Sequence, residues 1–115
     1  MKLLTHNMLT SPGVAKGFPL KIVATKVETM ETDFNAHFVA RMVEKLEWGA
    51  LLGAVEQLGL DAKLPAAVPE GYAEDETFLR ALHHVIVEVE VVEGELICPE
   101  TSRKFPIKGG IPSMI

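Results

Sequence analysis

The clearest pattern of apolar and polar positions lies in the last part of the chain, Val85 to Ile115. From Val87 to Val91, valine alternates with glutamate, which is the two-residue period of a strand with one buried and one solvent-facing side. Glu93-Gly94 then predicts a turn, and Glu95 to Cys98 predicts a returning strand. This part of the chain is therefore expected to fold as a β-hairpin.

The segment after this hairpin is apolar, but it cannot form a regular helix because prolines and glycines interrupt it. Its apolar members are Phe105, Ile107, Ile111, Met114 and Ile115, and its interruptions are Pro106, Gly109, Gly110 and Pro112. Such a surface either closes the domain's own core or marks a contact with another protein. The residue types alone leave both explanations open.

The amino-terminal part predicts one further strand, from Gly17 to Val27, which is β-branched in its second half. Pro19 suggests an edge strand or the start of a strand, because proline donates no hydrogen bond to a sheet. Residues 1–12 are ambiguous between a strand and a helical turn, and Thr10 to Gly13 predict a loop.

The middle of the chain has the periodicity of helices. The first is expected to begin at a cap on Asp33 or Asn35 and to run to about Lys45. The second runs from about Glu47 to Leu58, before Gly59. After a proline-rich connector over 61–72, the third runs from about Asp75 to His84, with acidic residues at its start that suit the helix dipole.

The order of these elements predicts an α+β fold. Strands at both ends of the chain, in residues 1–32 and 85–115, form a small antiparallel sheet domain. Residues 33–84 form an inserted helical lobe of about three helices. A hairpin alone is marginally stable, whereas three or four strands packed against a helix can stand.

Charge and composition narrow the function. The 115 residues carry a net charge of −5, and basic residues do not cluster beyond Arg103, Lys104 and Lys108, so a general phosphate-binding surface is not expected. We expect neither a secretory signal nor a membrane span, because the apolar runs are short. The single cysteine suits a reducing compartment, which favours the cytoplasm and the nucleus.

No set of side chains predicts a catalytic or metal site. Adjacent residues on a helix point about 100° apart, so His83 and His84 cannot easily face one metal, and both suit a helix carboxyl end. Because Cys98 is the single cysteine, an internal disulfide is excluded, and Cys98 is expected to be a packed thiol. Glu88 and Glu90 are expected on the solvent-facing side of their strand.

Several stretches together resemble a known family, the eukaryotic multifunctional methyltransferase subunit, over nearly the whole chain. These stretches are MKLLTHNML, GFPL, FNAHFVARMVEKLEW, EGYAEDETFLRALHHVIVEVEVVEGELICPE and FPIKGGIPSMI. The resemblance implies a sheet domain built from both chain ends, similar to a zinc ribbon, with an inserted helical lobe. It also implies a non-catalytic activator that stabilises S-adenosylmethionine-dependent methyltransferases as their heterodimer partner.

In this family the partners modify tRNA, ribosomal RNA and a translation termination factor. The resemblance therefore implies that RNA or the factor is bound only through the methyltransferase partner. The resemblance implies contact through an apolar face of the sheet domain and strand pairing near the carboxyl end. On this chain, that contact falls on Gly110, Ile111, Pro112, Ser113 and Met114. Main-chain hydrogen bonds would give such a contact its affinity.

The chain departs from the family at one point. Some members bind zinc through four cysteines, whereas this chain has Cys98 alone, so we expect no zinc and no cofactor, with S-adenosylmethionine bound by the partner. Two alternatives stand beside the activator. One is a degenerate zinc-ribbon-like domain that binds RNA directly through Arg103, Lys104 and Lys108, and the other is a small enzyme that uses Cys98 or the His83-His84 pair.

Overall fold

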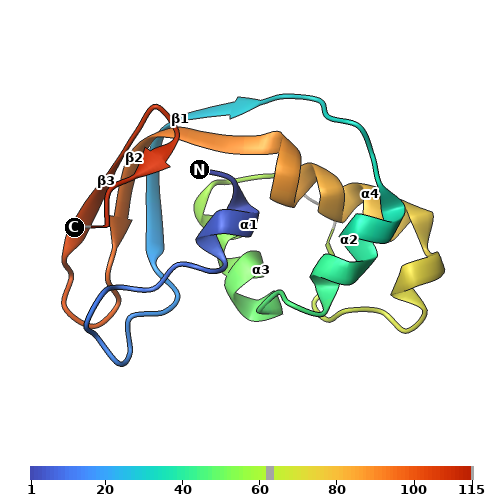
Figure 1. The fold of residues 1–115 in the computed structure, drawn as a ribbon, viewed down its shortest axis with the longest axis horizontal. Helices are drawn as coiled ribbons and strands as arrows, with labels where there is room; N and C mark the ends of the chain where they lie inside the picture. Colours follow the sequence, from blue (N-terminus) through green and yellow to red (C-terminus); the bar gives the residue numbers. More distant parts are fainter. Residues whose placement is uncertain (62–63, 115) are drawn as a thin grey trace.

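The structure is a computed structural model that describes residues 1–61 and 64–114. Its four strands form one antiparallel sheet in the order β1-β2-β3-β4 (Figure 1). The strands are β1 (Lys21–Thr29), β2 (Val89–Ile97), β3 (Lys104–Lys108) and β4 (Ile111–Pro112). β1 comes from the first part of the chain and the other three from its last part. The predicted α+β class, with a sheet built from both chain ends, is confirmed.

The helices also follow the predicted order. They are α1 (Leu3–His6), α2 (Ala36–Val43), α3 (Trp48–Gln57), the 3₁₀ turn η1 (Tyr72–Glu74) and α4 (Glu76–His83). The side chain of Asn35 accepts the backbone N–H of Phe38 at the start of α2, and Asp75 accepts that of Phe78 at the start of α4. Each cap satisfies an N–H that the first helical turn leaves without a partner.

The predicted strand at Val87 is wrong, because helical structure continues past α4. Residues His84–Glu88 form a π-helical turn, η2, and β2 begins at Val89. Val85 and Ile86 are neighbours in sequence and are both buried, at 1% and 0% exposure. A strand would place them on opposite faces, whereas a helical turn directs both into the core.

The predicted turn at Glu93-Gly94 is also wrong. β2 runs straight through it, and the pairing with β1 shifts register between Ala24 and Val27. Gly94 lies at φ +155°, and a Cβ there would stand 2.3 Å from the Val23 carbonyl oxygen. Glycine is therefore required here because two strands approach closely, and not because the chain turns. The chain reverses at Cys98–Arg103 instead, where the Cys98 N–H donates to the Arg103 carbonyl at 2.8 Å.

One continuous core joins the sheet to the helical lobe. Cross-strand partners Ile22, Leu96 and Phe105 are each at most 2% exposed and define the inner face of the sheet. Figure 1 shows the sheet at one end of the molecule and α2 with α4 at the other, with α1 and α3 between them. The core of the lobe comes from Val39, Leu51, Leu79 and Leu82.

The close approach at Gly94 gives the first prediction. Gly94→Ala is expected to lower the free energy of unfolding by about 1–3 kcal/mol, because its Cβ meets the backbone of β1. The matched control is Gly53→Ala in α3, where a Cβ meets nothing within 4 Å. Alanine should raise helix stability there by about 1 kcal/mol. Urea unfolding of both variants tests this, and equal effects would contradict it.

Candidate functional site

The carboxyl-terminal strand β4 lies at one edge of the sheet, and β1 lies at the other. β4 pairs with β3 through Lys108 opposite Ile111 and Ile107 opposite Pro112. An edge strand presents backbone donors and acceptors that an added strand can pair with. The family resemblance assigns residues 110–114 to partner contact, and these residues lie at or beside this edge of the sheet.

These five residues are placed differently from one another. Gly110 is engaged internally, since its N–H donates to the Val92 carbonyl at 2.9 Å and its own carbonyl accepts from the amino terminus. The Ser113 N–H donates to the Pro106 carbonyl at 2.9 Å. The Met114 side chain packs against the core. Ile111 is 73% exposed, and Pro112 beside it is half-buried.

The register of the sheet extends this exposed patch over its outer face. Cross-strand partners Val23, Glu95 and Pro106 share that face, as do Lys108 and Ile111. Val23 is 41% exposed although it is apolar. The tail therefore closes the core through Phe105 and Ile107, while Ile111 faces solvent.

The basic residues of the RNA-binding alternative lie near this face without forming a continuous patch. The Arg103 guanidinium stands over the Phe105 ring at 5.0 Å from its centroid. Lys104 and Lys108 are exposed at the two ends of β3, four residues apart. Glu95 stands on the outer face between them.

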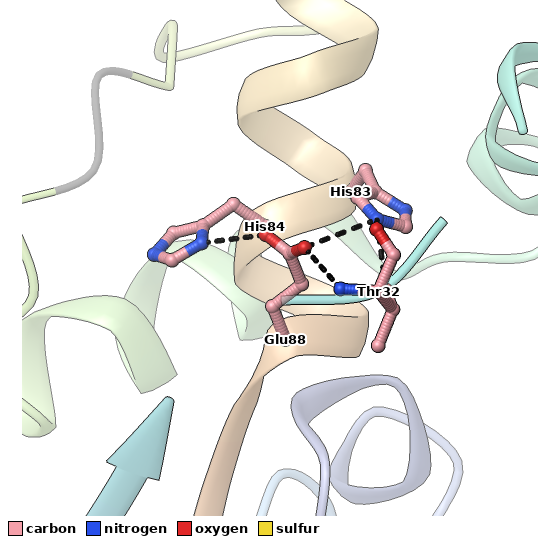
Figure 2. A network of polar contacts seen from close by, with 4 residues as sticks. All are labelled: Thr32, His83, His84 and Glu88. Atoms are coloured by element: carbon pink, nitrogen blue, oxygen red, sulfur yellow. Dashed lines mark hydrogen bonds and ion pairs between the residues drawn. The ribbon is translucent and has the colours of Figure 1, made fainter. Parts of the chain in front are cut away.

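A second cluster of polar side chains lies where the helical lobe joins the sheet, and Figure 2 shows it. Glu88 accepts the Thr32 backbone N–H at 2.7 Å and pairs with His84 Nδ1 at 2.9 Å. His83 Nε2 lies 3.0 Å from Thr32 Oγ1 and 3.5 Å from Glu88 Oε2. With Phe34 and Arg80, the four residues line an open cleft of about 420 Å³.

The solvent-facing position predicted for Glu88 is wrong, because its side chain is 12% exposed. The π-helical turn places it inside the join, beside His83, which is 5% exposed. The Thr32 N–H is the main cause that lowers the pKa of the Glu88 carboxyl, and the two histidines act in the same direction against desolvation. The carboxylate thus ties the segment after β1 to the turn that precedes β2.

This cluster does not have the arrangement of a nucleophilic relay. Thr32 Oγ1 and Glu88 both contact Nε2 of His83, whereas Nδ1 of His83 is buried without a hydrogen-bond partner. A relay needs the nucleophile on one ring nitrogen and the carboxylate on the other. Among residues 1–61 and 64–114, no group of three or more His, Cys, Asp and Glu side chains could hold a metal ion.

Cys98 is buried at the loop between β2 and β3, as the expected packed thiol. The Thr101 N–H donates to its sulfur at 3.4 Å, and Ser11 approaches from the other end of the chain. Polar contact with Ser11 is the main cause that lowers the pKa of the Cys98 thiol to about 7, and Thr101 acts in the same direction. Sequence reasoning missed this, because nothing near Cys98 in sequence points to Ser11.

The same contacts test whether the position fits a structural zinc ion. Such an ion needs four thiolate or imidazole ligands in a tetrahedron. Here one thiol stands beside the hydroxyl-bearing residues Ser11 and Thr101. This donor set does not fit zinc.

Fold and site together define a class: a small α+β domain with an open, partly apolar sheet edge, and with no catalytic constellation among the described residues. No helix in the described ranges is long and apolar enough to cross a membrane.

The particular family follows from comparison with known proteins. The Trm112p-like protein family model matches residues 2–110, and the chain belongs to this family. The multifunctional methyltransferase subunit TRM112-like protein of Mus musculus is 54% identical over 118 residues, which span 100% of this chain and 94% of that protein. TRM112 homolog A of Arabidopsis thaliana is 46% identical over 100% of the chain and 95% of its own length. The family expected from the sequence motifs is therefore confirmed.

A solved structure has the same fold. One of its chains superposes with a TM-score of 0.64 and 20% sequence identity, covering 100% of this chain and 95% of that one. That structure is the E. cuniculi Mtq2–Trm112 complex, described as responsible for the methylation of the eRF1 translation termination factor. These comparisons give no support to the RNA-binding alternative.

The join between lobe and sheet gives the second prediction. A carboxyl whose pKa is lower in the folded chain than in the unfolded chain stabilises the fold above its ordinary pKa, and this contribution is lost as the pH falls. Glu88→Gln should therefore lower the free energy of unfolding by about 1–3 kcal/mol at pH 7. The difference from the parent should shrink below pH 4.5, the ordinary pKa of glutamate.

Glu28→Gln is the matched control, since its carboxylate pairs with Lys26 at 3.4 Å in an exposed position. It should change the free energy of unfolding by less than about 0.5 kcal/mol. Urea unfolding of the parent and both variants at pH 7 and pH 3 makes the measurement. A Glu88→Gln effect of the same size at both pH values would show that the carboxylate charge is not what holds the join.

Proposed function

We propose that this chain is a non-catalytic subunit that binds S-adenosylmethionine-dependent methyltransferases as their heterodimer partner and stabilises them. One observation carries the proposal, namely the full-length similarity, 54% in one case, to proteins named multifunctional methyltransferase subunits. The methyl donor then belongs to the partner.

The contact is proposed at β4 and the outer face beside it, over residues 110–114. The free edge of β4 pairs with a strand of the partner through main-chain hydrogen bonds, and Ile111 fills an apolar pocket. Ile111 suits this role because an apolar side chain that is 73% exposed loses contact with water when a partner covers it. Gly110 supports the edge from inside, since its backbone groups are already hydrogen-bonded.

Stabilisation follows from mass action. A subunit that binds the folded methyltransferase, and not its unfolded chain, raises stability by about 2.7 kcal/mol at a free concentration one hundred times the Kd. Stabilisation of this kind requires no catalytic group from this chain. By the same proposal, the substrates are tRNA, ribosomal RNA and a translation termination factor, each met through the methyltransferase in the cytoplasm or the nucleus.

The exposed edge residue gives the third prediction. Ile111→Asp should weaken binding to a co-expressed methyltransferase by about 30-fold or more, the effect typical of a central apolar anchor. The matched control is Met30→Asp, because Met30 is 72% exposed but follows β1, at the opposite edge of the sheet. The control should bind within about twofold of the parent, since surface substitutions away from a contact have small effects.

Size-exclusion chromatography with calorimetry measures both affinities, and circular dichroism checks that the variants stay folded. Equal binding by both variants would rule out contact at β4. Calorimetry with S-adenosylmethionine adds a second readout, in which the complex should bind cofactor and the isolated chain should not. Binding of RNA by the isolated chain, lost when Arg103, Lys104 and Lys108 are changed to glutamine, would restore the alternative.

The fourth prediction concerns zinc. Because Cys98 is the single cysteine and no group of three or more His, Cys, Asp and Glu side chains in the described ranges could hold a metal ion, the fold is proposed to stand without metal. The purified chain should hold far less than one zinc per molecule by plasma mass spectrometry, even after growth with added zinc. EDTA should leave its unfolding temperature unchanged, whereas a zinc-ribbon protein measured in parallel should unfold. One tightly held zinc per chain would contradict the proposal.

A further inference from the structure

The central strand β2 contains a bulge opposite β1. Lys26 pairs with Glu93, and the next residue, Val27, pairs with Val91, so Val92 is an extra residue on β2 between two consecutive positions of β1. A bulged residue is left out of the ladder on that side, and it bends its strand locally. The bulge therefore changes the direction in which β2 presents its backbone and its outward side chains.

The turn between β3 and β4 is hydrogen-bonded to this bulge. The pairing of β3 with β2 covers the β2 residues from Gly94 to Ile97. Next to that ladder, the Gly110 N–H donates to the Val92 carbonyl at 2.9 Å. The Gly109 N–H donates to Glu93 Oε1 at 3.5 Å, which is long for a hydrogen bond. Two successive N–H groups of the turn thus meet acceptors on two successive residues of the bulge.

The conformation of the turn brings it close to β2. Its two central residues are glycines with positive φ, +58° at Gly109 and +80° at Gly110. This is the pattern of two-residue turns whose twist matches that of the strands they join. A Cβ on Gly110 would stand 3.2 Å from Glu90 Oε1, whereas a Cβ on Gly109 would meet nothing within 4 Å. Gly110 therefore lies against the side chains of β2, and Gly109 has open space beside its Cα.

The strand that follows the turn is short and contributes little to its own position. β4 has two residues, and its pairs with β3 are Lys108 with Ile111 and Ile107 with Pro112. Pro112 donates no hydrogen bond. Isolated two-stranded hairpins are marginally stable at best, even when they are longer than this one. Because Ile111 directly follows Gly110, the direction of its exposed side chain depends on how the turn is held.

We propose that the bulge in β2 positions β4 for partner binding, and that Glu93 is a positioning residue within it. The bulge holds the Gly109–Gly110 turn through the Val92 carbonyl and the Glu93 side chain, and the turn sets where Ile111 projects. The part about binding rests on the proposed function. The part about position does not, because it concerns the turn in the isolated chain.

The test removes the side-chain acceptor and measures the turn directly. In Glu93→Ala, amide hydrogen exchange at Gly109 and Gly110 should become about three- to tenfold faster, the range expected for the loss of one hydrogen bond. The Leu79 amide, which donates to the Asp75 carbonyl at the start of α4, is the internal reference and should be unchanged. Affinity for the co-expressed methyltransferase should fall by a similar factor, because β4 occupies its binding position less often.

Two further variants separate the hydrogen bond from other effects of the substitution. Glu93→Gln removes the charge but keeps a side-chain oxygen that can accept the Gly109 N–H, so both readouts should stay at the parent values. Glu56→Ala makes the same truncation at an exposed position of α3 and should also leave both readouts unchanged. Urea unfolding checks that all three variants remain folded under the conditions of the two assays.

The outcomes separate this proposal from the proposed function. Unchanged exchange at both glycines in Glu93→Ala overturns the positioning role, whatever the affinity does. Equal effects of Glu93→Gln and Glu93→Ala overturn it too, because the charge and not the hydrogen bond would then be responsible. Faster exchange with unchanged affinity overturns the link to docking, provided that Ile111→Asp abolishes binding in the same assay. If Ile111→Asp binds normally, then the assignment of the contact to β4 fails, and the link between the bulge and docking fails with it.

Discussion

The structure depends on the need to satisfy both edges of β2. This strand runs through the middle of the sheet, and its inward side chains Val89, Val91 and Leu96 are at most 1% exposed. Backbone groups buried this deeply must find hydrogen-bond partners. β1 supplies them along one edge, while β3 and Met1 divide the other. Segments from both ends of the chain therefore hydrogen-bond to β2, and the helical lobe is formed by the residues between these segments.

That arrangement decides which edges remain open. β1 carries Lys21 and the exposed Lys26–Glu28 pair, and the register shift opposite Gly94 makes its edge irregular. Charges and bulges on an edge strand discourage pairing with another chain. β4 carries no charged residue, but it is only two residues long and includes Pro112, which donates no hydrogen bond, and its first residue is the exposed Ile111. The two edges are thus not equivalent, since the edge at β1 is charged and irregular whereas the edge at β4 presents one exposed apolar side chain.

Local signals were sufficient for the helical lobe and insufficient for the sheet. The start of α2 was predicted at Asp33 or Asn35 and that of α4 at about Asp75, and the caps lie on Asn35 and Asp75, because a cap acts within one turn of chain. Glu93-Gly94 has the composition of a turn, yet Gly94 is required by the backbone of Val23, a contact across two strands. No local pattern records such an approach. Glu88 was misplaced for a similar reason, since its partner Thr32 is 56 residues away.

The candidate site divides in the same way. The motifs that carried the family resemblance led to residues 110–114, but not to the different roles that these residues have. Those roles follow from the two-residue period of the hairpin between β3 and β4. Phe105 and Ile107 alternate inward and close the core, whereas Lys108 and its partner Ile111 face outward. An apolar tail can therefore complete its own domain and still present a free apolar residue, because successive positions on a strand face opposite sides of the sheet.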